Sequence, residues 1–280
     1  MISIVICSIK EDFFITLEKN IQGTIGDVAY EIIKINNNIE KLSITKAYNL
    51  GIDRSKFKHL LFIHEDILFH SKNWGKVLID TFKNSNVGLV GIAGAKYKSK
   101  QPSAFWHTNM EMLHINLIQH KNNSSNLFTN GFANNQEEVA ILDGVFLGLN
   151  KETNVRFNEQ ILGFHCYDLG ISIDVLEKKY KLIVTNQILI EHFSIGNTDV
   201  EFLKGVIQFH ELYKNKLPKF INKSSNKLEK IALRKFLEVC LQNRYIPYRL
   251  WILNIFNNPF QKLNYNLLKL AIYKLLHNNG

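Results

Sequence analysis

The chain has 280 residues, of which 46% are hydrophobic and 21% are charged, with four Pro and 15 Gly. This composition excludes a disordered or collagen-like chain, and the length suits one large domain or one domain with an appendage. The three cysteines lie far apart with no Cys-x-x-Cys pair, which argues against a disulfide framework and fits a reducing cytoplasm. No run approaches the roughly 18 apolar residues of a membrane span, and the apolar residues 2–7 predict a buried strand rather than a signal peptide.

The net charge of +9 is concentrated in the C-terminal part of the sequence. Residues 201–280 contain 14 Lys+Arg and four Asp+Glu, whereas residues 1–200 contain 20 and 21 and are close to neutral. Such an asymmetry is typical of chains that meet an anionic partner, either a nucleic acid or a membrane surface.

Short apolar runs alternate with stretches of helical periodicity over the first hundred residues. The pattern predicts strands at residues 2–7, 30–35, 59–63 and 87–93, and helices at residues 13–20, 43–55 and 74–82. Strands that alternate with helices in this way indicate an α/β fold, with a mostly parallel twisted sheet and helices on both of its faces.

The later part of the chain is less regular and ends in helices. We expect a strand at 112–118, an Asn/Ser-rich surface loop at 121–135, two short strands within 138–149 that meet at Asp143-Gly144, a helix at 167–179 and a strand at 182–190. No strand is expected after residue 197, and amphipathic helices are predicted at 200–212, 228–241, 249–256 and 265–276. These elements indicate a domain over residues 1–198 and a basic helical region over residues 199–280.

Polar side chains follow three of the predicted strands. Ser8 comes after the first strand, Asn36 after the second, and His64, Glu65 and Asp66 after the third. Ligands of open parallel sheets bind beyond the carboxyl ends of the strands, so these side chains are candidates for a binding site. Two adjacent carboxylates after a buried strand are costly unless solvent or a cation neutralises them, and Mg²⁺ or Mn²⁺ commonly bridges such groups to phosphates. Capping of the next turn is the alternative role.

Several motifs resemble, in sequence order, those of family 2 glycosyltransferases of the GT-A fold. The similarity is strongest to the bacterial subset whose metal motif reads His-x-Asp instead of Asp-x-Asp, and it covers roughly residues 1–197. The motifs are the strand before Ser8, Ala47-Tyr48-Asn49-Leu50-Gly51-Ile52, Leu61-Phe62-Ile63-His64-Glu65-Asp66, Val90-Gly91-Ile92-Ala93-Gly94, Leu142-Asp143-Gly144-Val145-Phe146, Gly163-Phe164-His165-Cys166-Tyr167-Asp168 and Glu191-His192-Phe193-Ser194.

The resemblance implies a nucleotide-sugar site with a bound Mn²⁺ or Mg²⁺. Asp66 would ligate the ion directly, and His192 would complete its shell, although a His bonded to a nearby backbone carbonyl is the alternative for His192. His64 stands where the family usually has the first Asp and cannot supply its charge, so the resemblance assigns it a ribose contact or a place outside the metal ligands. Glu65 would face the nucleotide or solvent.

The resemblance also implies which residues act on the sugars. Asp168 corresponds to the general base of an inverting displacement, although an Asp that begins a helical stretch is also a common N-cap. Asp143 and Gly144 would lie beneath the donor and acceptor sugars, with an Asp-Gly turn as the alternative. His165, in the same motif as Asp168, is a further candidate for substrate binding.

The remaining candidates concern the nucleotide and a sugar platform. Ser8 and Asn36 would meet the nucleobase and ribose, where family members usually have Asp at the second position. Trp106 and His107 would form a sugar-stacking platform, with core packing as the favoured alternative for Trp106.

The function that the resemblance implies is a metal-dependent inverting glycosyltransferase. It would move a sugar from a nucleoside diphosphate, expected to be UDP, to a glycan or lipid-linked acceptor in bacterial surface polysaccharide synthesis. It would act in the cytoplasm, with peripheral attachment to the inner face of the cell membrane as a further option. A nucleotidyltransferase is disfavoured because residues 8–12, Ser-Ile-Lys-Glu-Asp, contain no glycine for a phosphate loop.

The basic C-terminal region leaves three roles open. Its helices are expected first to pack on the catalytic domain or on another copy of the chain, and second to dock on an anionic membrane. The third role, a non-catalytic nucleotide- or nucleic-acid-binding module built on residues 243–251, is the least favoured, although its basic and aromatic composition is typical of such surfaces.

Overall fold

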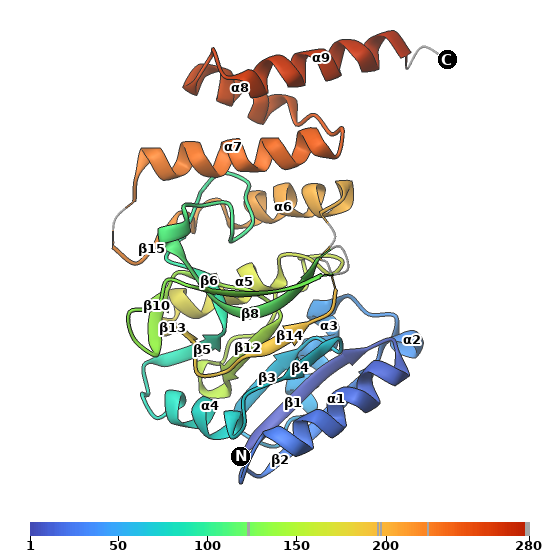
Figure 1. Ribbon diagram of the computed structural model, residues 1–280, viewed down its shortest axis with the longest axis vertical. Coiled ribbons are helices and arrows are strands. Elements are labelled where there is room, and N and C mark those ends of the chain that lie inside the picture. The colour runs from blue at the N-terminus through green and yellow to red at the C-terminus, as the bar shows by residue number, and fades with distance from the viewer. Residues whose placement is uncertain (122–123, 195, 197, 223, 278–280) are drawn as a thin grey trace.

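The computed structural model describes residues 1–121, 124–194, 196, 198–222 and 224–277. Its centre is a twisted seven-stranded sheet (Figure 1). In spatial order the strands are β10 (Gln136–Val139), β13 (Lys181–Thr185), β5 (Val87–Gly91), β12 (Phe146–Asn150), β3 (His59–Ile63), β1 (Ile2–Ser8) and β2 (Tyr30–Asn36). Strands β2, β1 and β3 are parallel, as are β13 and β5, whereas β12 and β10 run antiparallel to their neighbours. The α/β fold class is confirmed, with these two antiparallel strands added to the parallel core.

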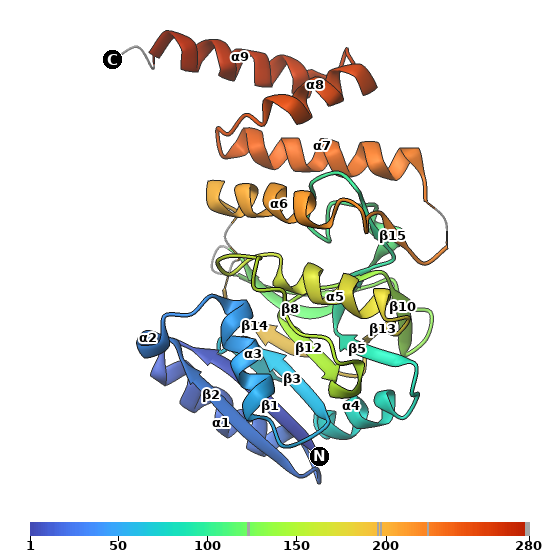
Figure 2. The same ribbon diagram turned by 180° about the vertical axis from the view of Figure 1, so that it is seen from behind.

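Helices cover both faces of this sheet, as predicted (Figures 1 and 2). Helices α1 (Glu11–Thr24) and α4 (Trp74–Phe82) pack against Ile4 and Ile6 of β1, whereas α3 (Ile44–Arg54) and α5 (Tyr167–Glu177) share a second apolar core with Val5. Successive side chains of a strand point to opposite faces, so β1 is apolar throughout because both of its faces are covered. Gly51 allows α3 to lie this close, since a Cβ at that position would collide with Val5.

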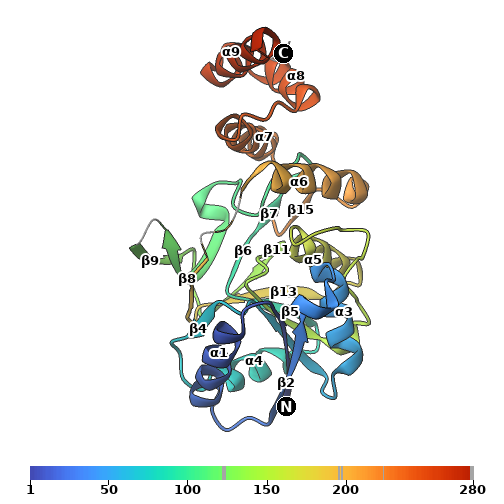
Figure 3. The same cartoon turned by 90° about the vertical axis from the view of Figure 1, so that its right-hand side faces the viewer.

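A second sheet lies against the carboxyl ends of the first. Its path is β11 (Ile141–Leu142), β6 (Ala93–Ala95), β8 (Leu113–Lys121), β14 (Ile190–His192) and β4 (Ile67–Phe69), and β9 (Ser124–Asn130) pairs with β8. The predicted strand at 112–118 and the two strands that flank Asp143-Gly144 are confirmed. The predicted loop at 121–135 is wrong in part, because β9 forms an antiparallel ladder with β8, visible at one edge in Figure 3. Residues 122–123 of that expected loop lie outside the described residues.

Two runs that the sequence predicts as single strands divide between the two sheets. The run 87–93 continues from β5 into β6, and the run 182–190 from β13 towards β14. The chain crosses in the same way from β3 to β4, with residues 64–66 at the crossing. The crossings therefore carry several candidate residues to the junction of the sheets.

Short elements complete the α/β part. These are α2 (Asn37–Glu40), the two-residue strand β7 (Tyr97–Lys98) and the 3₁₀ turns at Met110–Met112 and Lys151–Thr153.

The C-terminal region contains helices α6 (Val200–Tyr213), α7 (Asn226–Gln242), α8 (Tyr248–Asn257) and α9 (Lys262–His277), all near their predicted bounds. The expectation of no strand after 197 is wrong for β15 (Lys219–Phe220), which pairs with β7. Helix α6 shares a core with the α/β part through Leu203 and Val206, and Phe236 and Cys240 of α7 belong to the same core. Leu233 and Leu237 of α7 form a second, smaller core with α8 and α9. Among the described residues, no helix is long and apolar enough to cross a bilayer.

Candidate active site

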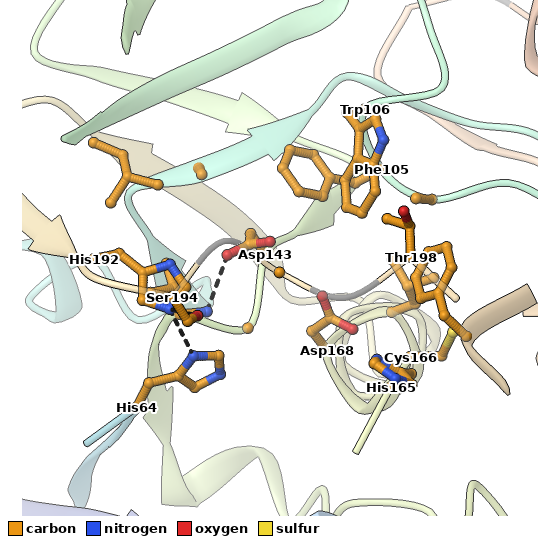
Figure 4. Close-up of a pocket in the computed structure, with 18 of the residues that line it drawn as sticks. His64, Phe105, Trp106, Asp143, His165, Cys166, Asp168, His192, Ser194 and Thr198 are labelled. Atoms are coloured by element: carbon orange, nitrogen blue, oxygen red, sulfur yellow. Dashed lines mark hydrogen bonds between the residues drawn. The ribbon is translucent and has the colours of Figure 1, made fainter. Parts of the chain in front are cut away.

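A cavity of about 450 Å³ opens at the junction of the second sheet, the N-terminus of α5 and helix α6 (Figure 4). This volume is typical of small-molecule sites. Its lining includes seven residues that the sequence singled out, namely His64, Trp106, Asp143, Gly144, His165, Asp168 and His192.

Two residues of the lining, His64 and His192, converge with Asp66, which does not itself line the cavity, to form a group of three potential metal ligands. The nearest ligand atoms of His64, Asp66 and His192 all lie within 4.8 Å of one another. His192 Nε2 is 3.5 Å from Asp66 Oδ1 and 3.3 Å from His64 Nδ1. The antiparallel pairing of β14 with β4 sets His192 opposite Ile67, which brings its ring beside Asp66.

Gln119 on β8 determines which nitrogen of His192 carries the proton. The Gln119 amide nitrogen donates to the backbone carbonyls of His192 and Ser194, so its oxygen must face the ring. That oxygen lies 3.0 Å from His192 Nδ1, which therefore donates to it. The remaining nitrogen, Nε2, faces Asp66, His64 and the Ser194 hydroxyl oxygen, which lies 2.9 Å away.

Tyr167 orients the ring of His64. Its hydroxyl donates to the Gly144 carbonyl at 3.1 Å and lies 2.8 Å from His64 Nε2. The other ring nitrogen, Nδ1, faces His192. Burial lowers the pKa of His64 to about 4, so this ring is neutral near pH 7.

Asp66 supplies the negative charge of this group. Burial alone would raise its pKa, but the contacts with His192, His64 and Ser194 outweigh burial and lower the pKa of Asp66 to about 2. Two imidazoles and one carboxylate fit a divalent cation, and the nitrogen ligands favour Mn²⁺ over the harder Mg²⁺.

Replacing Gln119 with Leu should weaken Mn²⁺ binding by about 10–100-fold, because His192 loses the acceptor that fixes its tautomer and ring orientation. Isothermal titration of the full chain with Mn²⁺ measures this loss. The matched control is Gln208→Leu on the exposed face of α6, which should leave the affinity unchanged. Equal Mn²⁺ affinity in Gln119→Leu and wild type would show that Gln119 does not position His192.

Two carboxylates, those of Asp143 and Asp168, also line the cavity. Asp168, in the first turn of α5, accepts hydrogen bonds from the backbone N–H groups of Leu169 and Gly144. Burial and the like charge of Asp143 outweigh these bonds and raise the pKa of Asp168. Burial raises the pKa of Asp143 as well. The alternative role of Asp168 as N-cap is wrong, because Cys166 occupies that position with a left-handed φ of 62°.

Asp143 and Gly144 form a tight turn between β11 and β12. Asp143 Oδ1 accepts from the Val145 N–H at 3.0 Å, so the turn interpretation holds while both residues also line the cavity. A Cβ at Gly144 would collide with the Tyr167 hydroxyl, so the close neighbour that requires glycine here is Tyr167. Tyr167, to which the sequence assigned no role, thus links the turn to His64.

A family model described as "Glycosyltransferase like family" matches residues 3–206. The chain belongs to this glycosyltransferase-like family. A solved structure with a similar fold is titled as GalNAc-T7 with UDP, GalNAc and Mn²⁺; it superposes with a TM-score of 0.53 at 10% identity and covers 85% of this chain. This likeness confirms the GT-A fold, although the match spans only 56% of the GalNAc-T7 chain. A search of curated protein sequences finds no significant match.

The cavity wall opposite His64 and His192 is aromatic in this glycosyltransferase-like chain. Trp106 is 37% exposed and stacks nearly parallel to Phe202 of α6, with ring centroids 6.0 Å apart, so the expectation of core packing is wrong. His165 makes an edge-to-face contact with the same Phe202 ring. His107 is buried behind this wall and forms no part of a platform. Trp106 lines the cavity with part of its ring exposed, so this part is available to a ligand, and sugars commonly lie against aromatic rings.

Ser8, Asn36 and Glu65 do not line the cavity. Ser8 and Asn36 are paired in register at the ends of β1 and β2, and Ser8 is buried. Glu65 accepts hydrogen bonds from the backbone N–H groups of Ile9 and Lys10, and so fastens the loop between β1 and α1. Their roles at a nucleotide stay predictions.

Proposed function

We propose that this chain is a metal-dependent inverting glycosyltransferase. It takes a sugar from a nucleoside diphosphate donor, a UDP-sugar, and transfers it to a glycan or lipid-linked acceptor in bacterial surface polysaccharide synthesis. The observation that carries the proposal is the arrangement of one cavity, which His64, His192, Asp143 and Asp168 line while Asp66 lies beside the two histidines.

The proposed metal site would stabilise the diphosphate as it leaves the donor sugar. A divalent ion held by Asp66, His192 and His64 would neutralise the charge that accumulates on the departing diphosphate. Gln119 and Tyr167 contact the two histidines and hold their rings in place for such an ion. His64 would then be a ligand, although it lacks the charge of the aspartate usual in the family.

Asp168 would serve the acceptor. As the acceptor hydroxyl oxygen bonds to the anomeric carbon, Asp168 takes its proton, and the bond from that carbon to the diphosphate oxygen breaks with its electron pair leaving on the phosphate. A base on the side opposite the leaving group gives inversion. The raised pKa makes Asp168 a stronger base than an ordinary carboxylate, provided that it is ionised at the working pH.

The cavity wall would hold the sugars. The face of Trp106 offers a stacking surface, and Asp143 and His165 offer polar groups beside it. The choice of UDP and Mn²⁺ is supported by the presence of both in the GalNAc-T7 structure and by the mixed nitrogen and oxygen ligands of this chain.

A thermal-shift panel of UDP-, GDP- and dTDP-sugars, each with Mn²⁺, with Mg²⁺ and with EDTA, tests the proposal. A donor at 100 times its Kd stabilises the folded state by about 2.7 kcal/mol, which raises the Tm of a chain of this size by about 5 °C. We expect this rise with one UDP-sugar in the presence of Mn²⁺ and its loss in EDTA. A panel without any metal-dependent rise would rule out a metal-supported nucleotide-sugar site.

A further inference from the structure

Helices α8 and α9 lie at one end of the long axis of the molecule, on the far side of α7 from the catalytic part (Figures 1 and 3). One face of each helix is buried against α7. Trp251 of α8 and Leu263 and Leu267 of α9 pack with Leu233 and Leu237 of α7 in the small C-terminal core. Their opposite faces therefore point away from the body of the protein.

These outward faces are apolar and aromatic rather than polar. On α8 the exposed residues Tyr248, Ile252 and Phe256 follow at intervals of four and form one stripe. On α9 a second stripe consists of Tyr265, Leu268, Ile272, Leu275 and Leu276, all exposed. Phe260, in the turn between the helices, is 98% exposed. A contiguous apolar surface of this kind on a folded domain marks an interaction site.

The charge around this surface has one sign. Residues 239–280 contain five basic residues and no Asp or Glu; the basic residues are Arg244, Arg249, Lys262, Lys269 and Lys274. Arg249, Lys262 and Lys269 are exposed, and Lys269 Nζ lies 4.6 Å from the centre of the Tyr265 ring. The Lys and Arg side chains of this segment are thus not balanced by any acidic side chain within it.

We infer that α8 and α9 dock the protein on an anionic lipid bilayer and lie in its interface. Aliphatic residues that enter the acyl boundary, aromatic rings at the headgroups and Lys/Arg on the phosphates are the combination that interfacial helices use. A second copy of the chain fits less well, because a symmetric dimer through this face would place the same uncompensated basic residues against each other. The inference rests on the surface alone and does not depend on the proposed transfer reaction.

Co-sedimentation of the full chain with phosphatidylcholine vesicles, with and without phosphatidylglycerol, tests the docking. Partitioning should be strong on the anionic vesicles, weaker on the neutral ones, and reduced by added salt. The double variant Phe256→Ser/Phe260→Ser should lower the partition coefficient by about tenfold or more, since both rings lose their apolar burial. Lys262→Gln/Lys269→Gln should lower it by about fivefold per charge, on anionic vesicles only.

A matched pair of isoleucines controls for the loss of any exposed apolar side chain. Ile272 on α9 and Ile15 on α1, at the other end of the molecule, have similar exposure. Ile272→Ser should weaken vesicle binding and Ile15→Ser should not, with the Tm of each variant as the check on folding. Equal binding to neutral and anionic vesicles, or unchanged binding of the Phe256/Phe260 variant, would overturn the inference. A stable wild-type dimer in light scattering that the same variant converts to monomer would show that a second copy covers the face.

Discussion

Asp66→Ala should abolish Mn²⁺-supported donor binding and reduce release of UDP from the donor by about 10²-fold or more. Asp66 is the only carboxylate among the three potential ligands His64, Asp66 and His192, and its removal leaves two imidazoles that would retain a divalent ion poorly. A metal that stabilises the leaving group contributes several kcal/mol to the transition state, which sets the size of the expected loss. The measurements are UDP release and the Tm rise with donor and Mn²⁺, using the donor that the thermal-shift panel selects.

The matched control for this substitution is Asp80→Ala. Asp80 lies on the exposed face of α4 and pairs with Lys76 and Lys83, and surface ion pairs of this kind contribute little to stability. Asp80→Ala should therefore retain both signals. If Asp66→Ala kept the Mn²⁺-dependent rise in Tm, the ion would have to bind elsewhere and the assigned role of Asp66 would be wrong.

Much of the fold could be predicted because burial on both faces leaves a clear trace in the sequence. Strand β1 is a run of β-branched apolar residues, and α3 and α4 show helical spacing between polar flanks. The division of residues 87–95 into β5 and β6 left no such trace, because Ile92 between them is buried as well and hydropathy is continuous. Strand β9 was missed because its side chains are exposed or half-exposed, and pairing of its backbone with β8 forms the strand.

In the candidate site, too, some residues could be selected from the sequence, whereas others become visible only through contacts between segments that are distant along the chain. Asp66 follows a strand, so its position along the chain selects it, whereas Asp143, Asp168 and His192 were selected by the motifs that resemble the family, and the roles of all four stay predictions. The partners that orient the histidines are long-range: 73 residues separate Gln119 from His192, and 103 separate Tyr167 from His64. The exposure of Trp106 likewise depends on where α6 places Phe202, which no local pattern could indicate.

Asp168→Asn should reduce transfer by about 10²–10⁴-fold while leaving the Mn²⁺-dependent rise in Tm with donor intact. The amide keeps the size of the side chain and its place in the first turn of α5, but it cannot accept the proton of the acceptor hydroxyl. The two variants therefore distinguish a general base from a metal ligand, because Asp66→Ala should lose both transfer and the Mn²⁺-dependent rise in Tm. A transfer rate near wild type in Asp168→Asn would remove Asp168 from the reaction.

The pH profile of kcat/KM is a second test of Asp168 as the general base. Burial and Asp143 raise the pKa of Asp168, so the base is ionised only at higher pH, and activity should fall on the acid side well above the ordinary carboxyl pKa of about 4. Asp143→Asn removes the like charge, which lowers the pKa of Asp168 and should move the acid limb to lower pH even if the maximal rate also drops. A limb at the same pH in Asp143→Asn and wild type would mean that the two carboxylates do not interact, and that the limb reports another group.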